Sequence, residues 1–353
     1  MVSAKFLAVL AGVTAALAQA EVESRTLDEI HQAALKEGGV VTCWHGGDEK
    51  NSRDSLKQAF EERFPGITLN ITVDLSKYHD TNLDTQIQQK GVYVDSIILQ
   101  TLHDYPRWKE QGVLLQYEPL GFDQVYDQFK DPDSYYSGLF VIAWSNVWNT
   151  QKISSSPKEF TDFLKPEYKD KLILTYPNDD DAVLYGFDLI VQNLGTEWFD
   201  GLLANNPLWV RGTATPRTLL RDNSTQWAAT FTSSGGLSPT APINASFPAD
   251  SAPFVSWPQT GAILKDAPHP EGAKLLHSYL LSDEYQNATG GWSARRDLSP
   301  QPSRYPDIFD MPNTNVTGFG AWMSDRANVE RARFFFESRI GTAQGLSPLD
   351  DDL

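Results

Sequence analysis

The stretch from Thr26 to Phe64 constrains the fold more than any other part of the chain. Its apolar residues recur at helical spacing before Gly38–Gly39, predominate from Val40 to Trp44, and recur at helical spacing again after the turn His45–Asp48. This order predicts a helix, a buried strand, a turn and a second helix. In an open α/β sheet, ligands bind beyond the carboxyl ends of the strands, so residues 44–51 are the first candidate site.

Two further strands follow at similar intervals. Ile67–Val73 and Val92–Leu99 are rich in β-branched residues, and Leu83–Lys90 between them has helical spacing. Consecutive strand–helix units require right-handed crossovers, so they predict a parallel sheet.

The composition of the chain changes beyond Asp131, where segments rich in aromatic and β-branched residues are followed by short helical patterns. This change predicts a second α/β block. Within it, Ser233–Asp250 is rich in Ser, Pro, Gly and Ala and predicts a long loop. Phe254–Trp257 predicts a strand that continues at Gly261–Leu264 after a turn. Pro270–Leu281 predicts a helix. The pattern indicates an α/β protein in which one block is inserted into another.

Residues 1–20 predict a secretory signal peptide. Lys5 precedes a short apolar run, and the small residues Ala18 and Ala20 offer two cleavage sites before the acidic Glu21. The run is too short to span a membrane, and no comparable run appears later. We therefore expect a secreted, extracellular protein without stable membrane insertion.

Composition limits the covalent chemistry and the partners that we expect. Cys43 is the only cysteine in 353 residues, so an intramolecular disulfide is excluded, and we expect the thiol to be buried. A net charge of −17 argues against nucleic acid and anionic membranes as partners. Five Asn-x-Ser/Thr sequons favour a glycosylated eukaryotic protein, and they begin at Asn70, Asn223, Asn244, Asn287 and Asn315.

Three blocks resemble bacterial periplasmic solute-binding proteins of the ferric-iron type. They are Thr26–Lys50 (TLDEIHQAALKEGGVVTCWHGGDEK), Trp108–Pro119 (WKEQGVLLQYEP) and Phe254–Gln286 (FVSWPQTGAILKDAPHPEGAKLLHSYLLSDEYQ), of which the last is the most specific. The likeness runs from about Thr26 to Gln301. Together with the leader and the sequons, it indicates a secreted eukaryotic version, of fungal type, of an ABC-transporter substrate-binding protein.

The resemblance implies a type 2 periplasmic-binding-protein-like fold, in which two α/β lobes with parallel or mixed sheets close on a ligand in the cleft between them. It places lobe 1 at residues 21–145 and 253–353 and lobe 2 at 146–252, with the C-terminal helices packing across both lobes. The chain would cross between the lobes near Gly138–Ser145 and Pro253–Trp257. The function would then be capture of a small molecule or ion by hinge closure, without catalysis or a cofactor.

The same layout maps ligand-binding candidates onto loops of both lobes and onto the two crossings. These are Trp44, His45, Gly46, Gly47, Asp48, Gln100, Thr101, His103, Trp144, Asp179, Asp181, Thr213, Arg217, Thr232, Ser233 and Trp257. Each has a structural alternative. Residues 179–181 precede a helix, whose positive N-terminus favours carboxylates, and the tryptophans fit hinge packing as well as ligand stacking. Arg217 fits an anion clamp or a surface ion pair.

The residues themselves argue against iron. Iron-binding members of this branch use two adjacent tyrosines of the second lobe, whereas the corresponding residues here are Phe231–Ser234, and Tyr135–Tyr136 lies before the first crossing. Hydroxyls, tryptophans and carboxylates suit a small organic ligand such as an amine or a sugar. A metal-ion site that uses His45 and His103 is the alternative for the same fold.

A secreted hydrolase is the third possibility. Trp44–Gly47 is similar to the His-Gly-Gly oxyanion loop of lipases and esterases, but the chain contains no Gly-x-Ser-x-Gly to present a nucleophile. We therefore predict a monomeric, non-enzymatic binding protein. The sequence leaves open the identity of the ligand and whether a transporter is a partner.

Overall fold

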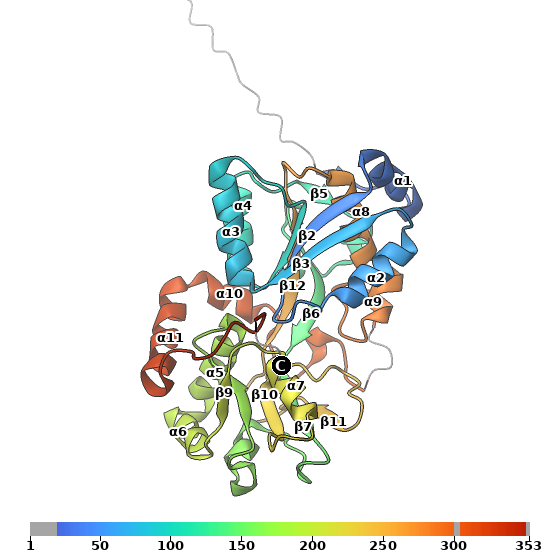
Figure 1. Cartoon of the computed structure of the whole chain (residues 1–353). Helices are drawn as coiled ribbons and strands as arrows, with labels where there is room; N and C mark the ends of the chain where they lie inside the picture. Colours follow the sequence, from blue (N-terminus) through green and yellow to red (C-terminus); the bar gives the residue numbers. More distant parts are fainter. Residues whose placement is uncertain (1–19, 300–303, 351–353) are drawn as a thin grey trace, which may run out of the picture.

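The computed structural model describes residues 20–299 and 304–350, so the predicted signal peptide lies, apart from Ala20, outside the described residues. The chain forms two α/β lobes, one above the other in Figure 1, that are joined by long strands. Within the described ranges, no helix combines the length and apolarity needed to cross a membrane.

Lobe 1 is built on a five-stranded sheet with the order β3-β2-β4-β12-β6. β2 (Val40–Gly46), β3 (Thr68–Asp74) and β4 (Ser96–Leu99) are parallel, which confirms the predicted strand–helix units. β12 (Ser256–Ile263) is antiparallel to both β4 and β6 (Ser137–Ala143), so the sheet is mixed.

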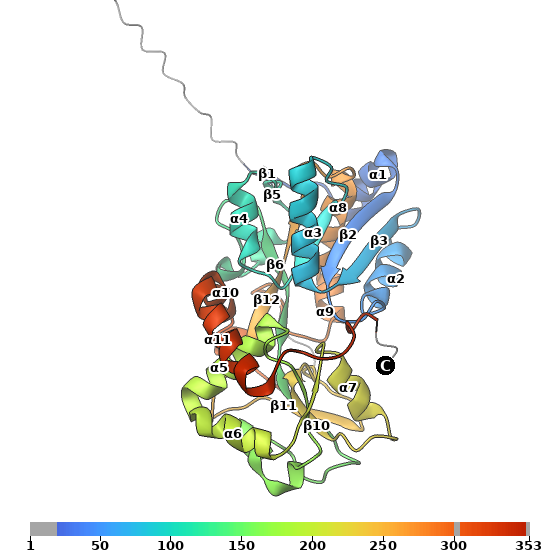
Figure 2. The same ribbon diagram turned by 60° about the vertical axis from the view of Figure 1, so that its left-hand side comes forward.

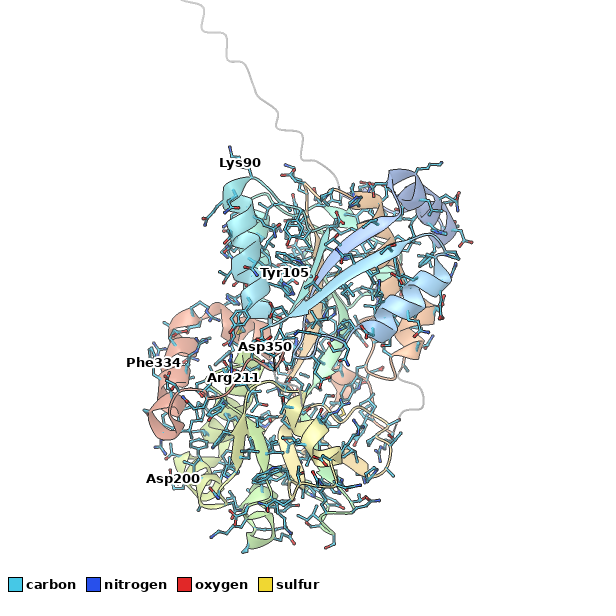
Figure 3. The ribbon with its side chains drawn as sticks, viewed as in Figure 1. Lys90, Tyr105, Asp200, Arg211, Phe334 and Asp350 are labelled. Atoms are coloured by element: carbon cyan, nitrogen blue, oxygen red, sulfur yellow. The ribbon has the colours of Figure 1, made fainter. Side chains whose placement is uncertain are left out.

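The prediction that β12 consists of two pieces separated by a turn is wrong. The strand is continuous, and a register shift between Gln259 and Thr260 absorbs the irregularity. Tyr105, in the interior of lobe 1 (Figure 3), accepts a 2.9 Å hydrogen bond from the Leu99 amide and donates one to the Thr260 carbonyl. Its hydroxyl therefore joins β4 to β12 at the shift.

Helices cover both faces of the lobe 1 sheet (Figure 1). One face packs against α1 (Leu27–Glu37), α2 (Asp54–Arg63), α8 (Pro270–Leu280) and α9 (Asp283–Ala288), and the other against α3 (Ser76–Gln89) and α4 (Asp104–Glu110). The side chains of β2 alternate between these faces: Val41 and Cys43 lie in the α1–α8 core, whereas Trp44 lies in the α3–α4 core. Cys43 is a buried free thiol, as predicted.

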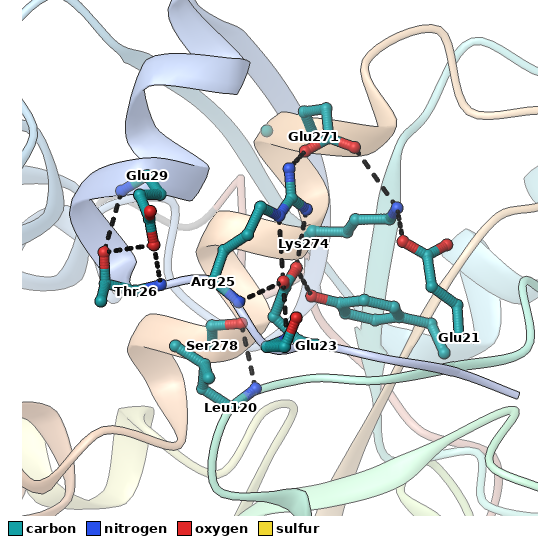
Figure 4. A network of polar contacts seen from close by, with 12 residues as sticks. Glu21, Glu23, Arg25, Thr26, Glu29, Leu120, Glu271, Lys274 and Ser278 are labelled. Atoms are coloured by element: carbon teal, nitrogen blue, oxygen red, sulfur yellow. Dashed lines mark hydrogen bonds and ion pairs between the residues drawn. The ribbon is translucent and has the colours of Figure 1, made fainter.

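The start of the described chain is anchored to lobe 1. β1 (Glu21–Val22) pairs with β5 (Tyr117–Glu118), and α1 begins with a capping box made by Thr26 and Glu29. Arg25 binds both Glu23 and Glu271 of α8, within the polar network drawn in Figure 4. This network holds the segment before α1 against α8.

Lobe 2 has two small sheets. β7 (Ser145–Asn149) lies between β10 (Ala229–Ser233) and β11 (Ile243–Ser246), and β8 (Ile173–Thr175) pairs in parallel with β9 (Leu208–Val210). β11 lies within 233–250, so the prediction of a continuous loop there is wrong. Ile243 and Ala245 alternate into the core, a pattern too short to stand out among prolines and serines. The helices of this lobe are α5 (Asp181–Leu194), α6 (Thr196–Ala204) and α7 (Thr215–Arg221).

The C-terminal helices lie where the lobes meet. α10 (Gly318–Ser324) contacts both α5 and β12, and α11 (Arg326–Ile340) packs on α5 (Figure 2). The lobe boundaries at 145/146 and 252/253 stay a prediction. Short 3-10 helices occupy Phe122–Gln124, Asp127–Phe129, Phe160–Leu164, Pro166–Tyr168 and Ile308–Asp310.

Candidate functional site

A cleft of about 670 Å³ lies between the lobes. Because β2 and β4 are parallel, their carboxyl ends bring residues 46–53 and 100–103 to the same edge of the lobe 1 sheet. The facing wall is formed by residues 178–181, 213–221 and 233–234 of lobe 2, and Arg326 and Arg333 of α11 close one side. The size is within the range of organic-ligand sites in proteins.

Two short polar bridges cross the cleft, beside longer contacts from Thr218 to Glu49 at 3.4 Å and from Arg211 to Tyr78 at 3.5 Å. Asp48 of lobe 1 accepts hydrogen bonds from the backbone amide of Thr213, at 2.7 Å, and from its hydroxyl. Lys77 at the start of α3 forms a 2.9 Å ion pair with Asp179, which Arg211 also contacts at 2.8 Å. Although burial opposes it, the hydrogen bond from Arg211 and the charge of Lys77 lower the pKa of Asp179, so this carboxylate is ionised.

Most of the residues expected at the site line this cleft. They are Gly46, Gly47, Asp48, Gln100, Thr101, His103, Trp144, Asp179, Asp181, Thr213, Arg217, Ser233 and Trp257. Their roles in ligand binding stay a prediction.

Three expected residues do not line the cleft. Trp44 stacks on His79 of α3 with ring centroids 4.9 Å apart, because its position in β2 points it into the core. His45 points to the opposite face and is fully buried beside Phe140. Thr232 is buried within lobe 2, where its hydroxyl accepts a hydrogen bond from the Thr175 amide.

The expected turn at 45–48 begins two residues later than predicted. β2 continues through His45 and Gly46, which pair in register with β3. The absence of a side chain at Gly46 is required here, since a Cβ would lie 2.1 Å from Ser76 Oγ. The close approach of β2 to the start of α3 therefore sets the shape of the cleft wall.

The two tryptophans at the crossings differ in exposure. Trp144 and Trp257 form an edge-to-face pair with centroids 5.0 Å apart. Trp257 is 1% exposed and donates its indole N–H to Gln259, whereas Trp144 is partly exposed and its indole nitrogen has no partner among the described residues. Trp144 is thus the ring with exposed surface against which a ligand can pack.

The two histidines proposed for a metal ion are not brought together into a site. The Nδ1 of His45 lies 2.7 Å from the Gly46 carbonyl oxygen and 3.2 Å from Arg53 Nε, behind the cleft wall. Burial lowers the pKa of both His45 and His103. Among residues 20–299 and 304–350, no group of three or more His, Cys, Asp or Glu side chains has a metal-binding arrangement.

Two carboxyls in the cleft have raised pKa values. Burial, followed by the charge of Asp48, raises the pKa of Asp180 to about 7. Asp180 accepts hydrogen bonds from the amides of Ala182 and Val183, so it caps α5, as the helix-capping interpretation of this stretch predicts. Burial, with Asp104 and Asp84 nearby, raises the pKa of Asp80 to about 7.

Sequence reasoning missed several side chains of the cleft. They are Ser52, Arg53, Ser76, Lys77, Asp80, Gln259, Arg326 and Arg333. Arg53 and Ser76 lie at the starts of α2 and α3, the helices that follow the predicted strands β2 and β3. The N-termini of these helices were therefore the sequence signal that could have identified both residues. Arg326 and Arg333 carried no such signal, since α11 follows the matched blocks.

The sequons lie mostly on the surface. Asn70, Asn223, Asn287 and Asn315 are exposed, and Asn244 in β11 is half-buried. The first four are therefore accessible for modification in the folded chain, and their glycosylation stays a prediction.

The sequence matches a known protein family. Residues 98–300 match the family model described as bacterial extracellular solute-binding protein, which is more than half of the chain. The chain belongs to this family. Its members are substrate-binding proteins, and the inter-lobe cleft is accordingly the place for a small ligand.

Solved structures of other solute-binding proteins share the fold. Iron-bound HitA from Pseudomonas aeruginosa is 17% identical with a TM-score of 0.61, and covers 84% of this chain and 99% of its own. AfuA from Actinobacillus pleuropneumoniae, with fructose-6-phosphate bound, is 16% identical with a TM-score of 0.64, over 86% and 99%. PotD from Streptococcus pneumoniae, a spermidine/putrescine-binding protein, is 18% identical with a TM-score of 0.56, over 84% and 100%.

These three neighbours bind an iron ion, a sugar phosphate and polyamines, so the shared fold does not select a ligand. A search of curated proteins found no match.

Proposed function

We propose that this solute-binding protein captures a small organic molecule between its lobes by hinge closure, and that it has no catalytic activity. The observation that carries the proposal is the pair of bridges across the cleft, Asp48 to Thr213 and Lys77 to Asp179. Contacts of this kind form only when the lobes approach each other. A ligand that touches both walls adds to them and shifts the equilibrium toward the closed form.

The alternatives receive less support from the same cleft. A metal ion would need several ligands at one point, and the described residues do not gather them. A hydrolase would need a nucleophile beside a base. The cleft serines 52, 76, 233 and 234 form no hydrogen bond with a histidine among the described residues.

Localisation and partners follow as further parts of the proposal. The predicted leader and the accessible sequons support a secreted, glycosylated eukaryotic protein, and we propose that it is monomeric and of fungal type. Such a protein would scavenge or sense a solute outside the cell, with or without a transporter that receives it.

A thermal-shift screen of the secreted protein tests capture. Sugars, amines, organic acids, phosphate esters and metal ions would each be added after any co-purified ligand has been removed by partial unfolding and dialysis. A ligand at a hundredfold its Kd stabilises a protein by about 2.7 kcal/mol, which is a shift of several degrees. Small-angle scattering should show a smaller radius of gyration with the ligand that gives the shift. A ligand that is turned over, or one that stabilises without compaction, would contradict capture by closure.

A further inference from the structure

Among the described residues, four arginines that line the cleft form no ion pair: Arg53, Arg217, Arg221 and Arg326. Two of them, Arg53 of lobe 1 and Arg217 of lobe 2, reach it from opposite walls. Arg53 of lobe 1 has one polar partner, His45, whose Nδ1 lies 3.2 Å from its Nε, and its guanidinium stands over the Phe140 ring at 5.6 Å. Arg217 of lobe 2 donates a 3.1 Å hydrogen bond to the Ser234 carbonyl. Among the residues that the structure describes, neither forms an ion pair.

Their environment differs from that of the paired arginines nearby. Hydrogen bonds to Asp179 raise the pKa of Arg211, as expected for a compensated charge. Burial instead lowers the pKa of Arg53 and of Arg217. An uncompensated charge in a partly desolvated site is costly, so its presence indicates that an opposite charge arrives from outside the chain.

The nearest carboxylates are already engaged. Asp48 accepts hydrogen bonds from the backbone amide and the hydroxyl of Thr213. Glu49 accepts a 3.4 Å hydrogen bond from the Thr218 hydroxyl. Neither forms an ion pair with either arginine. The two guanidiniums therefore keep N–H donors for a ligand in the cleft that they both line.

The wall beside Arg53 also offers donors to an anion. α3 is a fourteen-residue helix whose N-terminus carries no side-chain cap, and Leu75, Ser76 and Lys77 at that end line the cleft. The Ser52 hydroxyl is buried and has no partner among the described residues. Helix dipole, hydroxyl and guanidinium thus favour negative charge in the same part of the cleft.

We infer that the captured ligand carries an anionic head group, a phosphate or a carboxylate, held between Arg53 of lobe 1 and Arg217 of lobe 2. The inference rests on the proposed function and names its ligand class, in place of the amine or neutral sugar that the sequence favoured. An anion that joins two guanidiniums from opposite walls also explains how a ligand favours closure, because both contacts are available only in the closed form.

The remaining lining residues of the cleft indicate the chemistry of the rest of the ligand. At about 670 Å³ the cleft is much larger than an inorganic anion, and beyond the arginines it presents the Trp144 ring and the carboxyls of Asp80 and Asp181. Carboxyls accept hydrogen bonds from hydroxyl groups, and tryptophan packs against their carbon skeleton. The ligand is therefore an organic phosphate or carboxylate whose body carries hydrogen-bond donors such as hydroxyl groups.

Calorimetry and thermal shift with matched probe pairs test the inference. The probes are inorganic phosphate, citrate, glycerol 3-phosphate and glucose 6-phosphate, with glycerol, glucose and putrescine as their uncharged and cationic counterparts. We expect the anions to stabilise the wild type and the counterparts to have no effect. Arg53→Gln and Arg217→Gln should each weaken anion binding about tenfold or more. Arg331→Gln, which removes an exposed arginine of α11, should leave it unchanged.

A second readout separates ligand binding from a structural role. Removing an uncompensated charge should leave the melting temperature of ligand-free Arg53→Gln unchanged or higher. A lower melting temperature combined with an unchanged phosphate response would make Arg53 a structural residue and overturn the inference. Stabilisation by glucose or putrescine that both arginine variants retain would also overturn it, while capture itself would survive. If no probe stabilises the wild type, the anionic head group is rejected, and the broad screen then decides on capture.

Discussion

The carboxylate of Asp48 in lobe 1 accepts a 2.7 Å hydrogen bond from the backbone amide of Thr213 in lobe 2, and a second from the Thr213 hydroxyl. One side chain therefore satisfies two donors across the cleft. Asp48 follows β2, and Thr213 precedes α7, so the bridge joins the loop that the sequence singled out to a loop 165 residues further along.

Asp48→Ala should favour the open form. A hydrogen bond to a charged group contributes about 1.5–3 kcal/mol, so its loss would shift the equilibrium between open and closed forms substantially. We expect a larger radius of gyration by small-angle scattering without ligand, and weaker apparent binding of whichever ligand the screen identifies. Asp28→Ala, at an exposed carboxylate of α1, is the control. Equal scattering from both variants would show that the bridge does not hold the lobes together.

The sequence predicted the elements of lobe 1 well because their patterns are strong. Val40 to Trp44 is apolar apart from Thr42, as expected for a strand buried on both faces, and the helices beside it carry apolar stripes. The change in composition at Asp131 also predicted a second α/β block inserted into the first. β11 was missed because four residues with a weak alternation do not stand out in a proline-rich stretch.

The cleft was harder to predict, because direction along a strand decides which side chains reach it. Trp44 and His45 are adjacent to the cleft in sequence, yet the alternation of β2 turns one into each core. Arg53 is further along the chain and reaches the cleft because it starts a helix. A sequence pattern can locate a loop, but the residue at which the strand ends decides which side chains point into the cleft.

Trp257→Ala and Trp144→Ala should have different effects. Trp257 is almost fully buried against Phe319, so its loss should destabilise the fold by about 3–5 kcal/mol. Trp144 is partly exposed, and its loss should cost less stability while it weakens ligand binding. Chemical denaturation and calorimetry on both variants measure the two effects. Equal losses of stability would mean that Trp144 is a packing residue as well.

Glu23→Gln should destabilise the protein in a pH-dependent way. Although burial opposes it, hydrogen bonds from Arg25 and Tyr117 lower the pKa of Glu23 from 4.5 to about 2. Since the folded pKa lies below the unfolded value, the stabilisation is present above about pH 5 and is lost as the pH falls toward 2. The variant should be less stable by on the order of 1 kcal/mol at neutral pH, with a difference that shrinks in acid. Urea denaturation at several pH values measures it, and Glu110→Gln, at an exposed position of α4, is the control.

Asp180→Asn should show the opposite trend. The folded pKa of about 7 lies above the unfolded value of 3.8, so between these values the unfolded wild type loses a proton that the folded protein keeps. The wild type therefore loses stability relative to Asp180→Asn as the pH rises from 4 to 7, and asparagine still caps α5. Melting temperatures should diverge by several degrees in favour of the variant over this range and stay parallel above it. Parallel curves from pH 4 upward would show that Asp180 ionises freely.

Gly212→Ala should release the C-terminal segment from the edge of the cleft. Gly212 has φ +78°, and a Cβ there would lie 2.6 Å from the Cβ of Pro348, a buried residue of the segment that continues α11. This segment, dark red in Figure 2, passes the gap between the lobes, and Asp350 reaches 3.8 Å from Lys50 of lobe 1.

Gly236→Ala is a matched control for this substitution. Its φ is +71°, so alanine there carries a similar backbone cost, but no atom lies within 4 Å of the added Cβ. We expect both variants to lose about 1 kcal/mol from the backbone. Only Gly212→Ala should also show faster proteolysis after Gly341, because the contact with Pro348 is lost. Equal proteolysis of the two variants would mean that contacts other than Pro348, such as the hydrogen bond from Asn178 to the Gly341 carbonyl, hold the segment in place.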